Sequence, residues 1–132
     1  MVIKPTQEGD RQAMQDAPSE VRLSKDRSTL TLVFGTSEHA LDAEYLRVLT
    51  RSAEARGHSP AQAKTVYGKR NVRITGVEPI GNYALKLVFD DGHDSGIYAW
   101  SYLRELIDDR ETLWQAYLDE LKAKSLGRDP LF

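Results

Sequence analysis

The densest polar cluster in this 132-residue sequence is one short segment that combines an imidazole with three carboxylates, groups that can do acid–base or metal chemistry. The imidazole of His93 has an ordinary pKa of about 6.5, which suits proton transfer, pH sensing or metal ligation beside carboxylates. Aspartate and glycine are also the residues of tight turns, because Asp bonds nearby backbone N–H groups and Gly accepts positive φ. We therefore expect His93 to serve the turn, and a functional loop is the alternative. This candidate functional loop comprises Asp90, Asp91, His93, Asp94 and Ser95, with Tyr98 and Trp100 just beyond it.

The segment predicts no metal site, because consecutive positions in a tight turn rarely converge on one ion, and His93 is its one candidate ligand. The chain has no cysteine, which excludes disulfides, thiolate zinc sites and a cysteine nucleophile. The other histidines, His39 and His58, show no spacing that supports a shared site. A phosphate-binding glycine loop and the common hydrolase motifs are absent from the sequence. We therefore predict no cofactor.

A second candidate is the basic segment from Arg47 to Arg73, in which Glu54 is the only acidic residue. Solvated loop charge is the simplest interpretation, and a docking surface for an acidic protein or for RNA is the functional alternative. The net charge of −2 gives no general attraction to nucleic acid. This candidate docking surface comprises Arg47, Arg51, Lys69, Arg70 and Arg73.

Strands and helices must position these groups. Apolar residues that alternate with polar ones predict a β-hairpin from residue 21 to 34 and strands near residues 72–77 and 83–89. Helical spacing predicts helices over residues 38–54, with Ser37 as N-cap, from Trp100 to about residue 107, and over residues 110–124. Such an order favours an α+β fold, in which a small, largely antiparallel sheet packs against two to three helices.

Composition predicts one folded domain. The chain is 40% hydrophobic and 29% charged, which allows one core with a solvated surface. We expect a disordered leader over residues 1–18, a domain over residues 19–126 and a C-terminal tail over residues 127–132. The sequence shows neither a signal-peptide run nor about 18 consecutive apolar residues, so we expect a cytoplasmic protein without a membrane partner.

Three stretches carry a family resemblance. They are Tyr45-Leu46-Arg47, residues 68–74 and residues 79–103, and the core of the last reads Asp91-Gly92-His93-Asp94-Ser95-Gly96-Ile97-Tyr98-Ala99-Trp100. On these motifs, residues 18–108 resemble a bacterial stand-alone family of unknown function related to the gamma-butyrobetaine hydroxylase N-terminal domain. The resemblance implies an α+β fold. Because this domain also occurs attached to P-loop scaffold proteins of iron–sulfur cluster assembly, it also suggests a link to that process.

The same resemblance bears on zinc. In the hydroxylases this domain holds zinc through three cysteines after an early Leu-Arg pair and a histidine in the later loop. By that correspondence His93 matches the histidine, whereas Thr50, Ser52 and Ala55 stand where the cysteines would be. Structural zinc needs four nitrogen or sulfur ligands. The resemblance therefore implies the fold without the zinc ligands and without the separate oxygenase domain.

The leading functional prediction is a non-catalytic interaction or accessory domain with an unknown protein partner, and the resemblance suggests a link to iron–sulfur or metalloprotein maturation. One alternative is a small metal-dependent or acid–base enzyme that uses the Asp90–Ser95 loop. Another is an RNA-binding module that uses the basic 47–73 segment. A nucleic-acid partner is the less expected of these because of the net charge.

Overall fold

A computed structural model of the chain describes residues 2–3, 17–50, 65–91 and 96–129. Every strand pairing within this part is antiparallel, and helices follow the strands, which confirms the predicted α+β class. The elements are β1 (Val2–Ile3), β2 (Glu20–Leu23), β3 (Thr29–Phe34), β4 (Ser37–Asp42), α2 (Ala43–Val48), β5 (Ile74–Ile80), β6 (Ala84–Phe89), β7 (Gly96–Ala99), α4 (Trp100–Asp108) and α5 (Arg110–Ala123).

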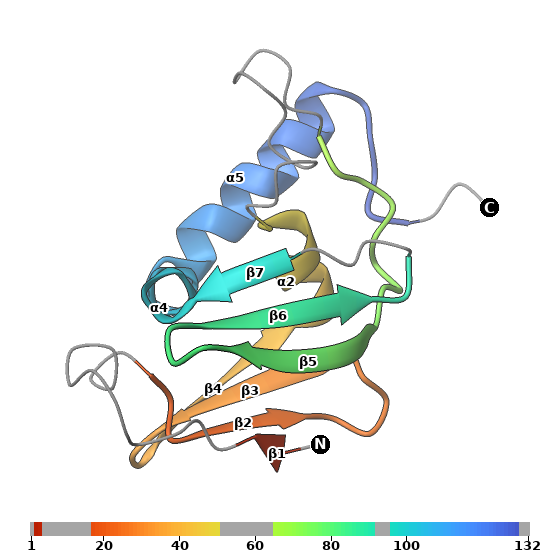
Figure 1. Ribbon diagram of the computed structural model, residues 1–132. Helices are drawn as coiled ribbons and strands as arrows, with labels where there is room; N and C mark the ends of the chain where they lie inside the picture. Colours follow the sequence, from red (N-terminus) through yellow and green to blue (C-terminus); the bar gives the residue numbers. More distant parts are fainter. Residues whose placement is uncertain (1, 4–16, 51–64, 92–95, 130–132) are drawn as a thin grey trace.

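The strands form two sheets where a single one was expected. One sheet has the order β1-β2-β3-β4 and the other the order β5-β6-β7, and Figure 1 shows the second above the first. The sheets are joined where the backbone N–H of Ile74 donates to the carbonyl of Arg27 at 2.8 Å. Both sheets bury their apolar faces in one shared core, so they form one structural unit.

The predicted hairpin is confirmed as β2 and β3. Val21 lies opposite Leu32 and Leu23 opposite Leu30, and all four side chains are buried. In the turn, Asp26 Oδ1 accepts the backbone N–H of Ser28 at 3.1 Å. Hydrogen bonds from the hydroxyls of Ser28 and Ser24 lower the pKa of Asp26 to about 2. The turn therefore follows from local Asp and Ser chemistry, as the sequence indicated.

The predicted helix over residues 38–54 is wrong in its first part. Residues 37–42 form β4, paired with β3 so that Leu41 lies opposite Leu30. The helix α2 starts only at Ala43, and Ser37 caps no helix. Leu41 has the helical spacing that the sequence shows from residue 41 to 49, but pairing with β3 buries it (1% exposed) as a strand residue. Long-range pairing thus overrides the local pattern.

The second sheet follows the predicted strands closely. The strand expected near residues 83–89 is β6, and the one expected near residues 72–77 is β5, which continues through Pro79 to Ile80. The turn between them lies at Gly81, whose φ is +53°. Positive φ suits glycine, which has no Cβ.

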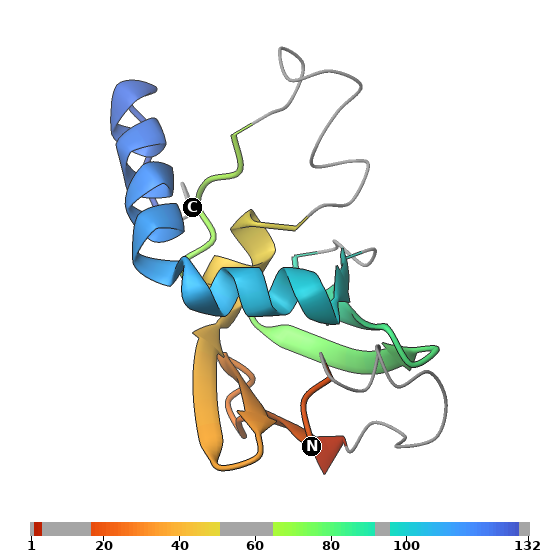
Figure 2. The same ribbon diagram turned by 90° about the vertical axis from the view of Figure 1, so that its left-hand side faces the viewer.

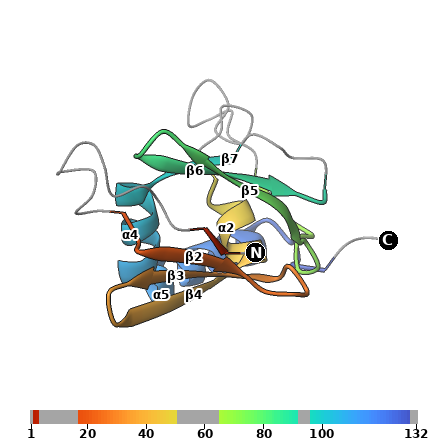
Figure 3. The same cartoon turned by 60° about the horizontal axis from the view of Figure 1, so that its bottom comes forward.

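The helices close the core on the remaining sides. The predictions for α4 and α5 are confirmed. In Figure 2, α4 lies across one end of the two sheets and α5 leads away from it, and in Figure 3, α2 lies between the sheets. The hydroxyl of Tyr45 in α2 donates to the carbonyl of Leu106 in α4 at 2.7 Å. No helix in the described ranges is long and apolar enough to span a membrane.

Both ends of the described chain make contacts that the sequence did not predict. Within the expected leader, Val2–Ile3 pairs with β2, so the expectation of disorder does not hold for these two residues; residues 4–16 lie outside the described part. Near the other end, Gly68 N–H donates to Gly127 O at 3.0 Å and Arg70 N–H to Arg128 O at 2.9 Å. The start of the expected tail therefore packs on the domain, and the boundary at residue 126 stays a prediction.

Candidate functional site

The candidate functional loop connects β6 to β7. Its first two carboxylates, Asp90 and Asp91, follow the end of β6 directly. Tyr98 and Trp100 come from β7 and from the start of α4. His93, Asp94 and Ser95 lie outside the described residues, so their predicted roles stay predictions.

Asp91 joins the two candidate sites. Its Oδ2 atom lies 2.8 Å from Arg47 Nε and 2.7 Å from Lys69 Nζ. The side chains of Asp91 and Arg47 are only 15% and 11% exposed. Charge-assisted hydrogen bonds at this distance and burial are stronger than those between neutral groups. The first basic residue of the docking surface and the acidic loop are therefore partners in one internal network.

Asp90 binds the backbone that enters β5. Its Oδ1 atom accepts the N–H of Arg73 at 3.0 Å, and its own N–H donates to the Arg73 carbonyl at 2.9 Å. The two bonds extend the pairing of β5 and β6 by one position beyond the strand ends. Asp90 thus serves the sheet.

Tyr98 is a buried structural side chain. Its ring is fully buried, and its hydroxyl donates to the carbonyl of Leu46 at the end of α2. Burial raises the pKa of this phenol strongly, with a smaller opposing effect from the Thr50 hydroxyl. A phenol that stays neutral and whose proton is already donated is poorly placed to exchange protons with a substrate.

The indole of Trp100 also has a structural role. Its Nε1–H donates to the Asn82 carbonyl in the β5–β6 turn at 2.9 Å, and the side chain is 2% exposed. Trp100 therefore fastens the start of α4 to the second sheet.

The close approach of β7 to the end of α2 depends on Gly96. A Cβ at this position would lie 2.9 Å from Tyr98 Cε1 and 3.2 Å from Thr50 Oγ1. Both distances are shorter than ordinary van der Waals contact. Thr50, which stands at one of the cysteine positions of the hydroxylase domain, is thus packed against β7, while Ser52 and Ala55 lie outside the described part.

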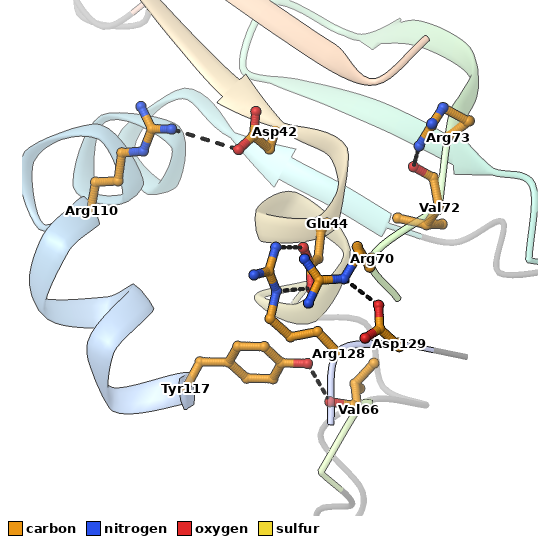
Figure 4. A network of polar contacts seen from close by, with 10 residues as sticks. All are labelled: Asp42, Glu44, Val66, Arg70, Val72, Arg73, Arg110, Tyr117, Arg128 and Asp129. Carbon is orange, nitrogen blue, oxygen red and sulfur yellow. Dashed lines mark hydrogen bonds and ion pairs between the residues drawn. The ribbon is translucent and has the colours of Figure 1, made fainter. Parts of the chain in front are cut away.

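The remaining residues of the candidate docking surface do not form one free cationic patch. Arg70 Nε donates to Asp129 Oδ1, and Arg73 Nη1 donates to the Val72 carbonyl at 3.0 Å (Figure 4). Arg51 lies outside the described residues. Among the described members, Arg47, Lys69 and Arg70 each pair with a carboxylate, which lowers the positive potential available to a partner.

Sequence reasoning missed an ion pair between α2 and the C-terminal residues. Arg128 Nε and Nη2 donate to Glu44 Oε2 and Oε1 at 2.9 and 2.7 Å, as Figure 4 shows. The Arg128 guanidinium also lies 5.1 Å from the ring centroid of Trp114 in α5, within the range of a cation–π contact. The available signal was weak, because a single Glu in a short helix and a single Arg near the end point to nothing in particular.

A pocket of about 350 Å³ lies beside this ion pair. Arg110 at its wall donates from Nη1 to the Ala40 carbonyl at 2.9 Å. The lining carries both signs of charge together with two aromatic side chains, which fits no single class of ligand. Its lining residues are Asp42, Tyr45, Arg110, Glu111, Trp114 and Arg128.

Metal ligands do not converge in the part of the chain that the structure describes. No group of three or more His, Asp or Glu side chains there is arranged to hold an ion. The prediction for His93 as a ligand is outside this part.

Comparisons with known proteins place the chain in a family. One NMR solution structure has a TM-score of 0.73 and 50% sequence identity, and the match covers 86% of this chain and 90% of that one. A second NMR solution structure has a TM-score of 0.72 and 36% identity over 98% of this chain and 93% of that one. No curated protein gives a significant match.

A crystal structure adds a relative whose function is unknown. It is a protein from Acidithiobacillus ferrooxidans assigned to the DUF971 family, with a TM-score of 0.55 and 31% identity over 70% of this chain and 93% of that chain. Residues 21–104 match the family described as gamma-butyrobetaine hydroxylase-like, N-terminal, which agrees with the resemblance found in the sequence. The chain therefore belongs to the gamma-butyrobetaine hydroxylase-like N-terminal family.

Proposed function

We propose that this chain is a non-catalytic domain that acts by binding a protein partner. The observation that carries the proposal is the carboxylate of Asp91, which lies within 2.8 Å of both Arg47 and Lys69. A general acid or base must reach a substrate proton within hydrogen-bonding distance. The carboxylate of Asp91 is instead engaged with two cations of the fold.

The other described members of the loop support the same conclusion. Asp90 binds backbone at Arg73, and Tyr98 and Trp100 donate to backbone carbonyls. Each of these polar groups holds two parts of the chain together. Because these groups are already hydrogen-bonded within the fold, the described part of the loop offers no free nucleophile, acid or base. This disfavours the enzyme alternative.

An RNA-binding role has less support than protein binding. Phosphate contacts need accessible cations, whereas three of the four described basic residues of the segment, Arg47, Lys69 and Arg70, are each paired with a carboxylate of the same chain. Binding of RNA should weaken steeply with salt, and should fall when Lys69 and Arg70 are replaced. We expect no salt-sensitive binding at physiological ionic strength.

A role in iron–sulfur or metalloprotein maturation would be exerted through the partner. The support for this role is that the family's domain also occurs attached to scaffold proteins of iron–sulfur cluster assembly. The described residues themselves hold no converging set of metal ligands. This more specific role is therefore separable from the interaction itself.

Recovery of the tagged chain from native extract, with cross-linking, mass spectrometry and metal analysis, tests both levels. We expect one protein to be enriched in a fixed ratio, and metal in the recovered complex would support the maturation role. An unrelated domain of similar size and net charge is the control. A chain that is recovered alone, and that turns over a substrate in an activity screen, would contradict the proposal.

A further inference from the structure

The outer edge of β7 is an unprotected strand edge in the described structure. β7 is the last strand in the order β5-β6-β7, and it lies uppermost in the second sheet in Figure 1. The register pairs Ala84 with Ala99, so Tyr83 lies opposite Trp100 at the next position. Trp100 N–H donates to the Tyr83 carbonyl at 2.9 Å, which makes this a hydrogen-bonded pair.

The direction of the remaining backbone groups follows by alternation. Hydrogen-bonded and non-hydrogen-bonded pairs alternate along an antiparallel ladder. Gly96 and Tyr98 therefore direct their N–H and C=O groups toward β6. Ile97 directs its N–H and C=O groups away from the sheet, and Ala99 directs its N–H the same way, so another extended chain can bond these three groups. The Ala99 carbonyl, at the N-cap of α4, accepts the first hydrogen bond of the helix instead.

A pocket lies beside these same two residues. It has a volume of about 300 Å³ and lies at the corner between β7 and the first turns of α4. The side chain of Ile97 is 49% exposed there. Its lining residues are Ile97, Ala99, Ser101, Tyr102 and Glu105. An apolar side chain next to an outward-facing backbone is the arrangement that added strands use for specificity.

The edges of β4 and β5 are protected in ways that the described part of the structure does not show at β7. β5 has a register shift after Ile74 and contains Pro79, and Arg27 Nη1 donates to the Thr75 carbonyl at 3.0 Å. At β4, Arg110 donates to the Ala40 carbonyl. Bulges, proline and covering side chains are the usual protection against unwanted strand pairing. Residues 96–99 contain no proline and no charge.

We propose that an extended segment of a partner protein pairs with β7 as an added strand and places a bulky apolar side chain in the pocket at Ile97, Ala99 and Tyr102. This inference rests on the interaction function proposed above and names its surface. A second copy of the chain is a poorer occupant. Four residues span only about 13 Å, and edge pairing over that length buries far less than the roughly 1,200 Å² of a stable dimer.

Hydrogen exchange in the free chain gives the first test. Ile97 and Ala99 amide hydrogens should exchange rapidly, because they face away from β6. The amide of Tyr98 between them should exchange slowly. Slow exchange at Ile97 and Ala99 in the free chain would show that the edge is already covered and would overturn the proposal.

A matched pair of variants at Ala99 gives the second test. The φ of Ala99 is −64°, which proline adopts without strain, and proline is accepted at helix starts. Ala99→Pro therefore removes the outward N–H while the bonds to β6 remain. Ala99→Ser keeps this N–H and is the control. Circular dichroism verifies that both variants are folded.

The probe is a dodecapeptide selected from a phage-displayed random library against the wild-type chain. We expect the bound peptide to protect the amides of Ile97 and Ala99, and the Ala99→Pro variant to bind roughly tenfold more weakly, since a partner carbonyl loses its donor. Ala99→Ser should bind like wild type. Equal binding by both variants, protection elsewhere or no enriched peptide would overturn the proposal.

The two proposals fail in different ways. If the native partner from the extract cross-links to a face other than β7, the interaction function stands and the edge proposal is wrong. If the chain has no native partner, the function itself is wrong, whatever peptides bind the edge.

Discussion

The guanidinium of Arg128 forms a two-pronged ion pair with the carboxylate of Glu44, which lies 84 residues earlier in the chain. The Glu44 side chain is only 7% exposed, whereas that of Arg128 is 31% exposed. Two parallel hydrogen bonds fix the geometry of such a pair as well as its distance. The pair therefore fastens the C-terminal residues to the start of α2.

Replacement of Arg128 by alanine should destabilise the fold. Glu44 would remain buried without its counter-charge, and the contact with Trp114 would be lost. We expect the free energy of unfolding to fall by about 1–3 kcal/mol, less than for a fully buried pair because Arg128 is partly solvated. Chemical denaturation measures this. Arg70→Ala is the control, since its pair with Asp129 is exposed and should contribute little; equal effects of the two variants would contradict this account.

Asp91→Asn should also lower the stability. The asparagine side chain is neutral, so it leaves the largely buried guanidinium of Arg47 and the ammonium of Lys69 without this anionic partner. We expect the free energy of unfolding to fall by about 1–3 kcal/mol. Asp90→Asn is the matched control, because the asparagine Oδ1 can still accept the N–H of Arg73. Urea denaturation of both variants separates a charge effect from a general effect of the loop. An unchanged midpoint for Asp91→Asn would show that this network stabilises nothing.

Gly96→Ala tests the close approach between β7 and α2. The added methyl would meet the Tyr98 ring and the Thr50 hydroxyl, and such overpacking typically costs about 1–3 kcal/mol. At Gly127 a Cβ has nothing within 4 Å, so Gly127→Ala should leave the melting temperature nearly unchanged. If both variants melt like wild type, the contact at Gly96 is looser than described.

Alkaline pH should destabilise the fold through buried phenols. Burial raises the pKa of Tyr45 from 10.0 to about 12, so the neutral phenol is favoured in the folded state. This stabilisation is fully present below pH 10 and is lost as the pH rises from 10 toward 12. The unfolding free energy of Tyr45→Phe should fall less steeply over this range. Part of the fall should remain, because the pKa of Tyr117 is also raised to about 12. Parallel curves for wild type and Tyr45→Phe would contradict the assignment.

Locally patterned elements could be predicted from the sequence. The hairpin of β2 and β3, the strand β6 and the helix α5 are each specified by residues within one short window, so periodicity and turn chemistry suffice. β4 could not be predicted, since Leu41 is a strand residue only because Leu30 lies opposite it. The division into two sheets is likewise a matter of long-range pairing.

The candidate site shows the same limit. The sequence singled out both Asp91 and the basic residues Arg47 and Lys69, but as two separate features. Their contact depends on bringing the end of α2 beside the end of β6, positions 44 residues apart for Arg47 and Asp91. The charge of a residue does not indicate whether its side chain forms an ion pair within the same chain or with another molecule.

The ion pair of Glu44 and Arg128 also has a consequence for biosynthesis. The carboxylate is translated 84 residues before the guanidinium that neutralises it, which at about 5–20 residues per second is an interval of roughly 4–17 s. During that interval, any folded part of the chain that buries Glu44 does so without its counter-charge. The native arrangement around α2 is therefore complete only after Arg128 has been added and has left the ribosome, and a chain that stalls before codon 128 lacks the partner of Glu44.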